Sequence, residues 1–245
     1  MTARHLSGRE SKYRYRGRDQ SPDRGAWSDR RYRSDDFSEG CQAPTRDRNA
    51  WGSGTRELAS ASPTLVRMWQ VTRSQIAYEN PWIRVVEDQV IHPDGTQGMY
   101  GVVELRQPAV FVVAVSDRGE VLLETVERHT VGPSIEIPAG GSDGEDLLAA
   151  AKRELYEETG YLAEHWRSIG SMNALNGVCR AAEHVFLAQG LSRSADGADA
   201  TAEGISAVSW VAWPDLLGMI AAGTITDGET LASLMYAAIA LGKIT

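Results

Sequence analysis

The sequence has little of several features that define common protein classes. Cysteine is nearly absent: the two in 245 residues, Cys41 and Cys179, lie far apart in segments of different composition. This argues against a disulfide framework and suits a reducing cytoplasm. The longest apolar run, residues 231–241, is about half the length of a membrane-spanning helix. The first residues are hydrophilic, unlike those of a secretory signal. These absences predict a cytoplasmic protein without a membrane segment.

Common catalytic and cofactor motifs are missing as well. The five histidines are scattered, and no spacing of histidine with cysteine suggests a zinc site. The glycines form neither a phosphate-binding loop nor a dinucleotide fingerprint, and no Ser/His/Asp arrangement can be picked out. The net charge of −8 gives no global reason to expect a nucleic-acid partner.

Residues 1–64 differ in composition from the rest. They contain no valine and no isoleucine, and their 13 basic and 9 acidic residues give a net charge of +4, so residues 65–245 carry −12. Because such a segment cannot bury enough apolar surface to offset the entropy lost on ordering, we expect a disordered leader. Its basic and aromatic stretches, residues 13–18 and 30–33, are compatible with RNA or an acidic partner. The interleaved aspartates favour a solvated tail instead.

One stretch, residues 135–161, concentrates acidic charge in a helical pattern. We expect a helix over about residues 145–158, ended by Gly160, where a left-handed cap is favoured. Glutamates at positions i, i+3 and i+4 of this helix share one face, and the adjoining arc is apolar and is expected to face the core. The acids are Glu154, Glu157 and Glu158, and the apolar arc is formed by Leu147, Leu148, Ala151 and Leu155.

The acidic face is locally unfavourable. Like charges one turn apart repel by roughly 0.2–0.5 kcal/mol a pair, and the helix dipole disfavours each anion in the last turn by about 0.3–1 kcal/mol. Arg153 can relieve part of this cost by pairing with Glu157. A hard divalent cation would relieve more, because Mg²⁺ binds carboxylate oxygens together with substrate phosphates. Taken alone, three glutamates favour the more ordinary interpretation, a solvated acidic face.

The residues around these acids resemble a known family. Glu145 is followed, after seven residues, by Arg153 and then by Glu-Leu-Tyr-Glu-Glu-Thr-Gly-Tyr, which ends at Tyr161. This run resembles the second half of the Nudix box, Gly-x5-Glu-x7-Arg-Glu-U-x-Glu-Glu-x-Gly-U, where U is bulky and apolar. Only four residues separate Gly140 from Glu145, one fewer than the pattern has, and this puts the role of Glu145 in question.

The resemblance implies a site for Mg²⁺, with Mn²⁺ as an alternative ion. The ligands that it implies are the helix glutamates, one backbone carbonyl and, more weakly, the first glutamate of the box: Glu154, Glu157, Glu158, Ala139 and Glu145. Arg153 would orient Glu157. Two candidates remain for the general base, Glu154 and Glu203, the latter in the small, polar loop of residues 192–204. Asp199 competes with Glu203, and a solvated loop acid is the ordinary interpretation of either.

The segment Ile-Glu-Ile-Pro-Ala-Gly before the helix matches the lead-in of the ADP-ribose pyrophosphatase branch of that family. In this branch an arginine at the place of Arg128 meets substrate phosphate, and Glu136 would touch the substrate. An ion pair or a loop hydrogen bond would also explain these two residues. Asn176 stands where the branch has a proline that marks its substrate class, so the resemblance favours pyrophosphate chemistry more than it favours ADP-ribose itself.

Alternating runs predict the remaining elements. Residues 69–77, 83–91 and 99–105 predict an antiparallel β subdomain over residues 65–107, with a turn at residues 92–95. Its aromatic residues are candidates for stacking on a base, although packing or a subunit interface is the more ordinary role; they are Trp69, Tyr78 and Trp82. The core, residues 108–245, is expected to have strands at 109–115, 120–126, 165–171, 183–188 and 206–213, and helices at 214–222 and 229–241.

The expected fold is therefore α/β: a Nudix-type α/β/α sandwich with a mixed sheet and a small N-terminal antiparallel subdomain. The expected activity is Mg²⁺-dependent hydrolysis of a nucleoside diphosphate linked to another group, and ADP-ribose or an ADP-sugar would give AMP and a sugar phosphate. The resembling branch also implies a homodimer. Another nucleotide sugar or an oxidised nucleoside triphosphate is the nearest alternative. A non-hydrolytic ligand sensor is the alternative from another class, although this box keeps its carboxylates and the leader shows no helix-turn-helix.

Overall fold

The computed structural model describes residues 68–195 and 204–244. The predicted leader, residues 1–64, and the loop candidates Asp199 and Glu203 lie outside the described residues. No helix in the described part of the chain is long and apolar enough to span a membrane.

The N-terminal subdomain is a four-stranded sheet with the order β1-β2-β3-β9. Its strands are β1 (Gln70–Glu79), β2 (Ile83–Ile91), β3 (Gln97–Leu105) and β9 (Cys179–Arg180). The first three strands are antiparallel, as the alternating runs predict. The two-residue strand β9 pairs with β3 in parallel and was not predicted, because two residues carry no periodic signal.

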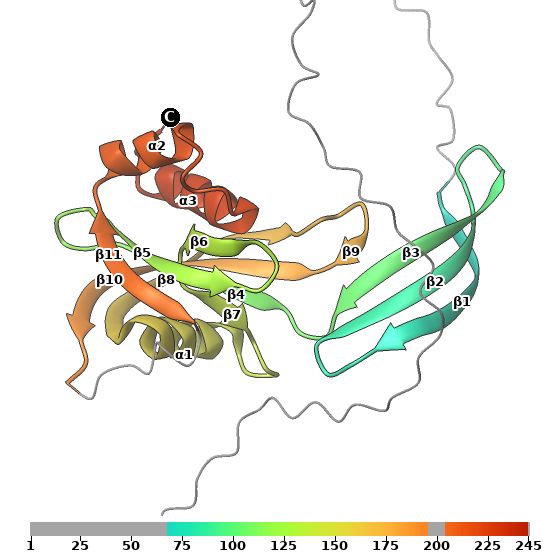
Figure 1. Cartoon of the computed structure of the whole chain (residues 1–245), viewed down its shortest axis with the longest axis horizontal. Coiled ribbons are helices and arrows are strands. Elements are labelled where there is room, and N and C mark those ends of the chain that lie inside the picture. Colours follow the sequence, from blue (N-terminus) through green and yellow to red (C-terminus); the bar gives the residue numbers. More distant parts are fainter. Residues whose placement is uncertain (1–67, 196–203, 245) are drawn as a thin grey trace, which may run out of the picture. The chain divides into compact units, whose positions relative to one another are not determined.

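Two further sheets form the core (Figure 1). One has the order β7-β4-β10-β8, and β4 runs parallel to β10 while the other pairs are antiparallel, so the sheet is mixed as predicted. The other has the order β11-β5-β6 and is antiparallel throughout. The strands are β4 (Ala109–Ala114), β5 (Val121–Arg128), β6 (Gly132–Glu136), β7 (Ala139–Gly141), β8 (Tyr161–Asn173), β10 (Ala182–Arg193) and β11 (Ile205–Val211).

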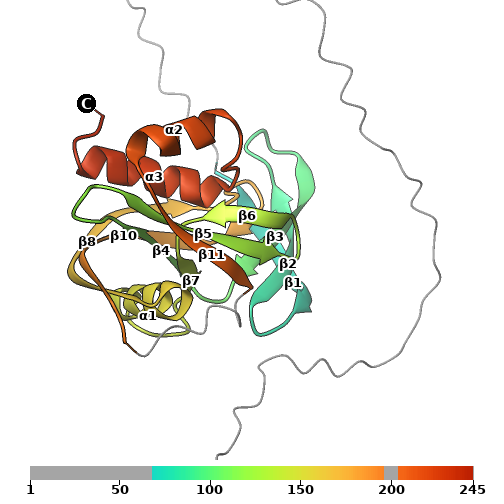
Figure 2. The same cartoon turned by 60° about the vertical axis from the view of Figure 1, so that its left-hand side comes forward.

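Helices cover the core sheets on both sides, which confirms the α/β/α sandwich. Helix α1 (Leu147–Thr159) lies on one side, and α2 (Trp213–Ala221) and α3 (Gly228–Ala240) lie on the other (Figures 1 and 2). Helix α1 begins where the carboxylate of Asp146 accepts hydrogen bonds from two backbone N–H groups of the first turn, and it ends at Gly160, whose φ of 72° gives the predicted left-handed cap.

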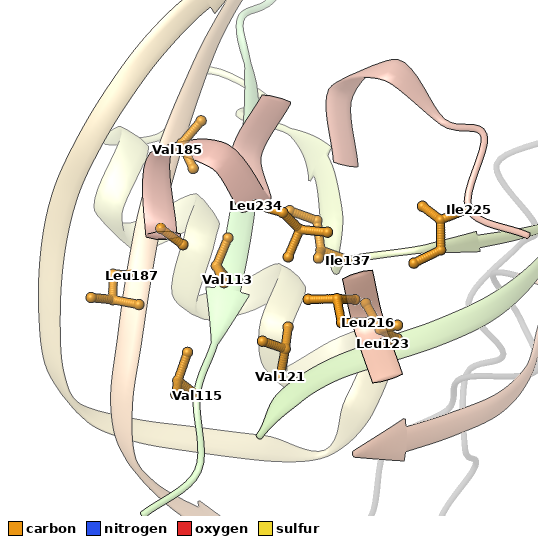
Figure 3. Packing of buried hydrophobic residues seen from close by; sticks show 11 residues of the cluster. Val113, Val115, Val121, Leu123, Ile137, Val185, Leu187, Leu216, Ile225 and Leu234 are labelled. Carbon is orange, nitrogen blue, oxygen red and sulfur yellow. The ribbon is translucent and has the colours of Figure 1, made fainter. Parts of the chain in front are cut away.

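The hydrophobic core has one cluster under each helical layer. Val113, Leu123 and Leu234 belong to the cluster that α2 and α3 cover (Figure 3). Leu155 belongs to the cluster under α1, together with Val112 on the opposite face of β4. Adjacent residues of β4 are thus fully buried on opposite faces, which explains why this strand is a continuous apolar run rather than an alternating one.

Candidate active site

Helix α1 directs two of its three predicted glutamates toward the core sheets. Glu154 and Glu158 are one turn apart and only 9% and 6% exposed. The side chain of Glu157 is half exposed and accepts a hydrogen bond of 3.0 Å from Arg153. The structure therefore separates the acidic face into an inner pair, Glu154 and Glu158, and an outer residue that pairs with arginine as predicted.

The short strand β7 holds the inner pair from the opposite side. The backbone N–H of Ala139 donates a 2.9 Å hydrogen bond to Oε2 of Glu158. Gly140 packs directly against Glu154, and a methyl group at this position would overlap the Glu154 carboxylate. A larger residue at this position would therefore displace the carboxylate of Glu154 from its place against the backbone. The predicted role of the Ala139 carbonyl stays a prediction.

Arg153 connects the helix to the loop that precedes it. Its guanidinium donates hydrogen bonds of 3.2 Å to Glu145 and 2.9 Å to the carbonyl of Gly141, and it lies 2.8 Å from Glu154. Glu145 therefore lies on the Arg153 side, with its side chain 44% exposed. Although burial opposes the charge of Arg153, the attraction of Glu154 and the hydrogen bonds with Glu157 and Glu145 raise its pKa above the ordinary value.

Arg128 and Glu136 are paired with each other across the β5–β6 hairpin. Nε of Arg128 donates to Oε1 of Glu136 at 3.1 Å, and Nη2 donates to Oε2 at 2.5 Å. Glu136 is buried, whereas the side chain of Arg128 is 42% exposed. The two predicted substrate-binding residues thus form a two-pronged ion pair, the geometry in which a guanidinium also binds phosphate.

The structure adds one carboxylate that the sequence did not single out. Glu124 lies in β5 opposite Glu136 and is 1% exposed. Neither of its oxygens has a hydrogen-bond partner within the described chain. Burial raises its pKa to about 8; the charge of Arg128 opposes this shift, and those of Glu136 and Glu154 add to it. The one available signal was a glutamate inside the apolar run Val-Leu-Leu-Glu-Thr-Val.

Glu158 completes this acidic cluster. Burial raises its pKa to about 10, and the charges of Glu124 and Glu154 add to the shift, while the hydrogen bond from Ala139 opposes it. No group of three or more acidic, histidine or cysteine side chains in the described residues is already arranged around a metal position. The donors are nevertheless carboxylate oxygens, whose repulsion a divalent cation would offset, and they fit a hard ion such as Mg²⁺.

The predicted stacking residue Trp82 belongs to the N-terminal subdomain, whereas the acidic cluster is formed by residues of β5 and α1. It occupies the turn between β1 and β2 and is 57% exposed. Its backbone N–H donates to the side chain of Asn80, which caps the turn. The role of Trp82 as a substrate contact stays a prediction.

Comparison with known proteins gives consistent matches over both parts of the described chain. The family model described as the NUDIX domain matches residues 105–234, and the one described as the nucleoside diphosphate sugar hydrolase N-terminal domain matches residues 69–103. The chain is 32% identical over 130 residues to an ADP-ribose pyrophosphatase of Bacillus subtilis (strain 168), which covers 52% of this chain and 70% of that protein.

Two further matches are more distant. The chain is 29% identical over 157 residues to a methanol dehydrogenase activator of Bacillus methanolicus, covering 63% of this chain and 84% of that protein. The crystal structure of an ADP compounds hydrolase has a TM-score of 0.64 at 16% identity, covering 73% of this chain and 96% of that chain. At that identity the likeness concerns the fold.

Proposed function

The chain belongs to the Nudix family of hydrolases, and from this premise we propose that it splits the pyrophosphate bond of a nucleoside diphosphate sugar. The proposed substrate is ADP-ribose or an ADP-sugar, and the products are AMP and a sugar phosphate. The observation that carries the proposal is the pair of buried glutamates, Glu154 and Glu158, held against the backbone of Ala139 and Gly140. A bound cation or a proton would reduce the repulsion between these two buried carboxylates.

We propose Mg²⁺ as the cofactor, with Mn²⁺ as a substitute. Its ligands would be drawn from Glu154, Glu157, Glu158 and the carbonyl of Ala139. Glu145 is the weaker candidate because it is held by Arg153 on the exposed side. A bound divalent cation supplies charge neutralisation for the diphosphate and lowers the pKa of water.

The residues of the chain would position the reacting groups. Arg153 fixes the loop by its bond to the carbonyl of Gly141 and holds Glu157 in place. Arg128, which is partly exposed, would release the carboxylate of Glu136 and bind a substrate phosphate oxygen instead, because a guanidinium can form paired hydrogen bonds with either acceptor. For proton removal from water, Glu154 and Glu203 are both candidates.

The N-terminal match supports the substrate class, since its description names nucleoside diphosphate sugar hydrolases. The named activity of the Bacillus subtilis relative supports ADP-ribose. The proline that marks the substrate class of that branch is replaced here by Asn176. Other nucleotide sugars and oxidised nucleoside triphosphates therefore remain alternative substrates. We also propose a homodimer, which the apolar residues exposed on β1 support: Val71, Ile76 and Tyr78 are each more than half exposed.

A product assay tests the proposal. The protein is incubated with ADP-ribose, ADP-glucose, GDP-mannose, NADH, diadenosine polyphosphates and deoxynucleoside triphosphates over a Mg²⁺ titration, and nucleoside monophosphate is separated by chromatography. We expect AMP from ADP-ribose or ADP-glucose, in amounts that rise with Mg²⁺ and vanish with EDTA. Binding of these compounds without cleavage at any Mg²⁺ concentration would indicate a ligand sensor and overturn the proposal.

A further inference from the structure

Glu124 occupies an unfavourable position that the family resemblance does not explain. It lies outside the box, in the middle of β5, and is 1% exposed. Both of its carboxylate oxygens are without a hydrogen-bond partner within the described residues. A buried carboxyl group in this state loses its water and gains nothing in return. Such a residue requires either a bound proton or a cation that the polypeptide does not supply.

The neighbouring arginines do not supply that cation. Arg128 lies in the same strand, but its guanidinium forms three hydrogen bonds with Glu136, at 3.1, 3.2 and 2.5 Å. Arg153 is shared between three other carboxylates, those of Glu145, Glu154 and Glu157. Among the described residues no lysine or arginine forms an ion pair with Glu124 or Glu158.

Two carboxylates of the site, Glu124 and Glu158, therefore have no ion-pair partner among the described residues, and they come from different elements. Glu158 projects from α1, and Glu124 projects from β5, where it stands opposite Glu136 in the register of the sheet. Leu122, two residues before Glu124 in the strand, packs in the cluster under α1 together with Leu155, so the side chain of Glu124 lies on the same face of β5, toward α1. Two carboxylates without an ion-pair partner can together neutralise one divalent cation, and carboxylate oxygens are the donors that Mg²⁺ and Mn²⁺ prefer.

We propose that Glu124 is a further ligand of the divalent cation and binds it together with Glu158 and Glu154. The inference rests on the proposed metal-dependent function and extends its ligand set beyond α1 to β5. The three side chains are not yet gathered around one point, so cation binding must rotate the flexible carboxylates toward one another. Glu124 would thereby anchor the ion to the sheet as well as to the helix.

The test measures metal binding without substrate. Titration of metal-free protein with Mn²⁺, with free Mn²⁺ read by electron paramagnetic resonance, compares the wild type with Glu124→Gln and Glu183→Gln. Glu183 is the matched control, because it is 4% exposed in β10, a strand of the other core sheet, and also has a carboxylate oxygen without a partner in the described chain. We expect Glu124→Gln to weaken Mn²⁺ binding at least tenfold and Glu183→Gln to leave it within twofold.

Equal Mn²⁺ affinity of Glu124→Gln and wild type would overturn the inference, and so would equal losses in both variants. A Mn²⁺-soaked crystal of the wild type gives a test that needs no variant: the anomalous peak should lie within coordination distance of the Glu124 carboxylate. A peak bonded only to residues of α1 and β7 would refute the assignment. Hydrolysis by the wild type decides the proposed function separately, since it does not depend on which carboxylates hold the ion.

Discussion

Glu183 offers a test of the buried electrostatics that is independent of any metal. It lies in β10 opposite Ala109 of β4 and Met172 of β8, and it is 4% exposed. Burial raises its pKa to about 7, and the charges of Glu229 and Asp227, at the start of α3, add to the shift. The folded protein therefore keeps a proton on Glu183 over a pH range in which the unfolded chain releases it.

The sign and size of the effect follow from this difference. The folded-state pKa lies above the ordinary value of 4.5, so the contribution of Glu183 to stability is complete below pH 4.5 and is lost as the pH rises to 7. At about 1.4 kcal/mol per unit the full loss would be about 3 kcal/mol. Glu229 and Asp227 are partly exposed, so water screens their repulsion and we expect about 1–2 kcal/mol.

Replacing Glu183 by glutamine removes the titration and keeps the shape of the protonated side chain. The free energy of unfolding, from urea denaturation in EDTA, should favour Glu183→Gln over wild type by about 1–2 kcal/mol more at pH 8 than at pH 4.5. Glu164→Gln, at an exposed position of the adjacent β8, is the control and should change stability equally at both pH values. A pH-independent difference for Glu183→Gln would refute the reasoning.

Three further changes test the active site and its scaffold. Glu158→Gln should lower turnover by about two orders of magnitude or more, because it weakens a proposed metal ligand while the fold survives, as circular dichroism would show; near-wild-type turnover would remove the assignment. Gly140→Ala should displace the Glu154 carboxylate and lower kcat about tenfold or more with little change in melting temperature, since the displaced group is the end of a flexible side chain. Gly160→Ala places a side chain at φ 72° and should cost about 1 kcal/mol in urea denaturation without changing KM.

The parts of the fold that the sequence predicted are those with strong local signals. Gly160 marks the end of α1 by its left-handed cap, and the apolar run of β4 marks a strand covered on both faces. Strands β6, β7 and β9 have five, three and two residues and were not predicted. Segments this short pair because tertiary packing brings them beside a longer strand, and no periodicity within them records it.

The same distinction explains what was found and missed in the site. The helix acids were predicted because their spacing repeats along one face, whereas Glu124 lies beside Leu122 and Leu123, which are as fully buried as it is. In a strand buried on both faces, alternation cannot tell which residue faces the helix. The partnership of Arg128 with Glu136 depends likewise on the register of the β5–β6 hairpin, which pairs Glu124 with Glu136.

The contacts of the two arginines of the site indicate different roles for them. Arg153 bonds to acceptors of the helix and to the carbonyl of Gly141 in the preceding strand, so moving it would release the loop. Arg128 has a single carboxylate partner among the described residues and a side chain that is 42% exposed, so we expect that an incoming phosphate would replace Glu136 without disturbing the backbone. Displaced Glu136 would then add its charge beside Glu124, which increases the need for a cation there. Substrate and metal binding should accordingly reinforce each other.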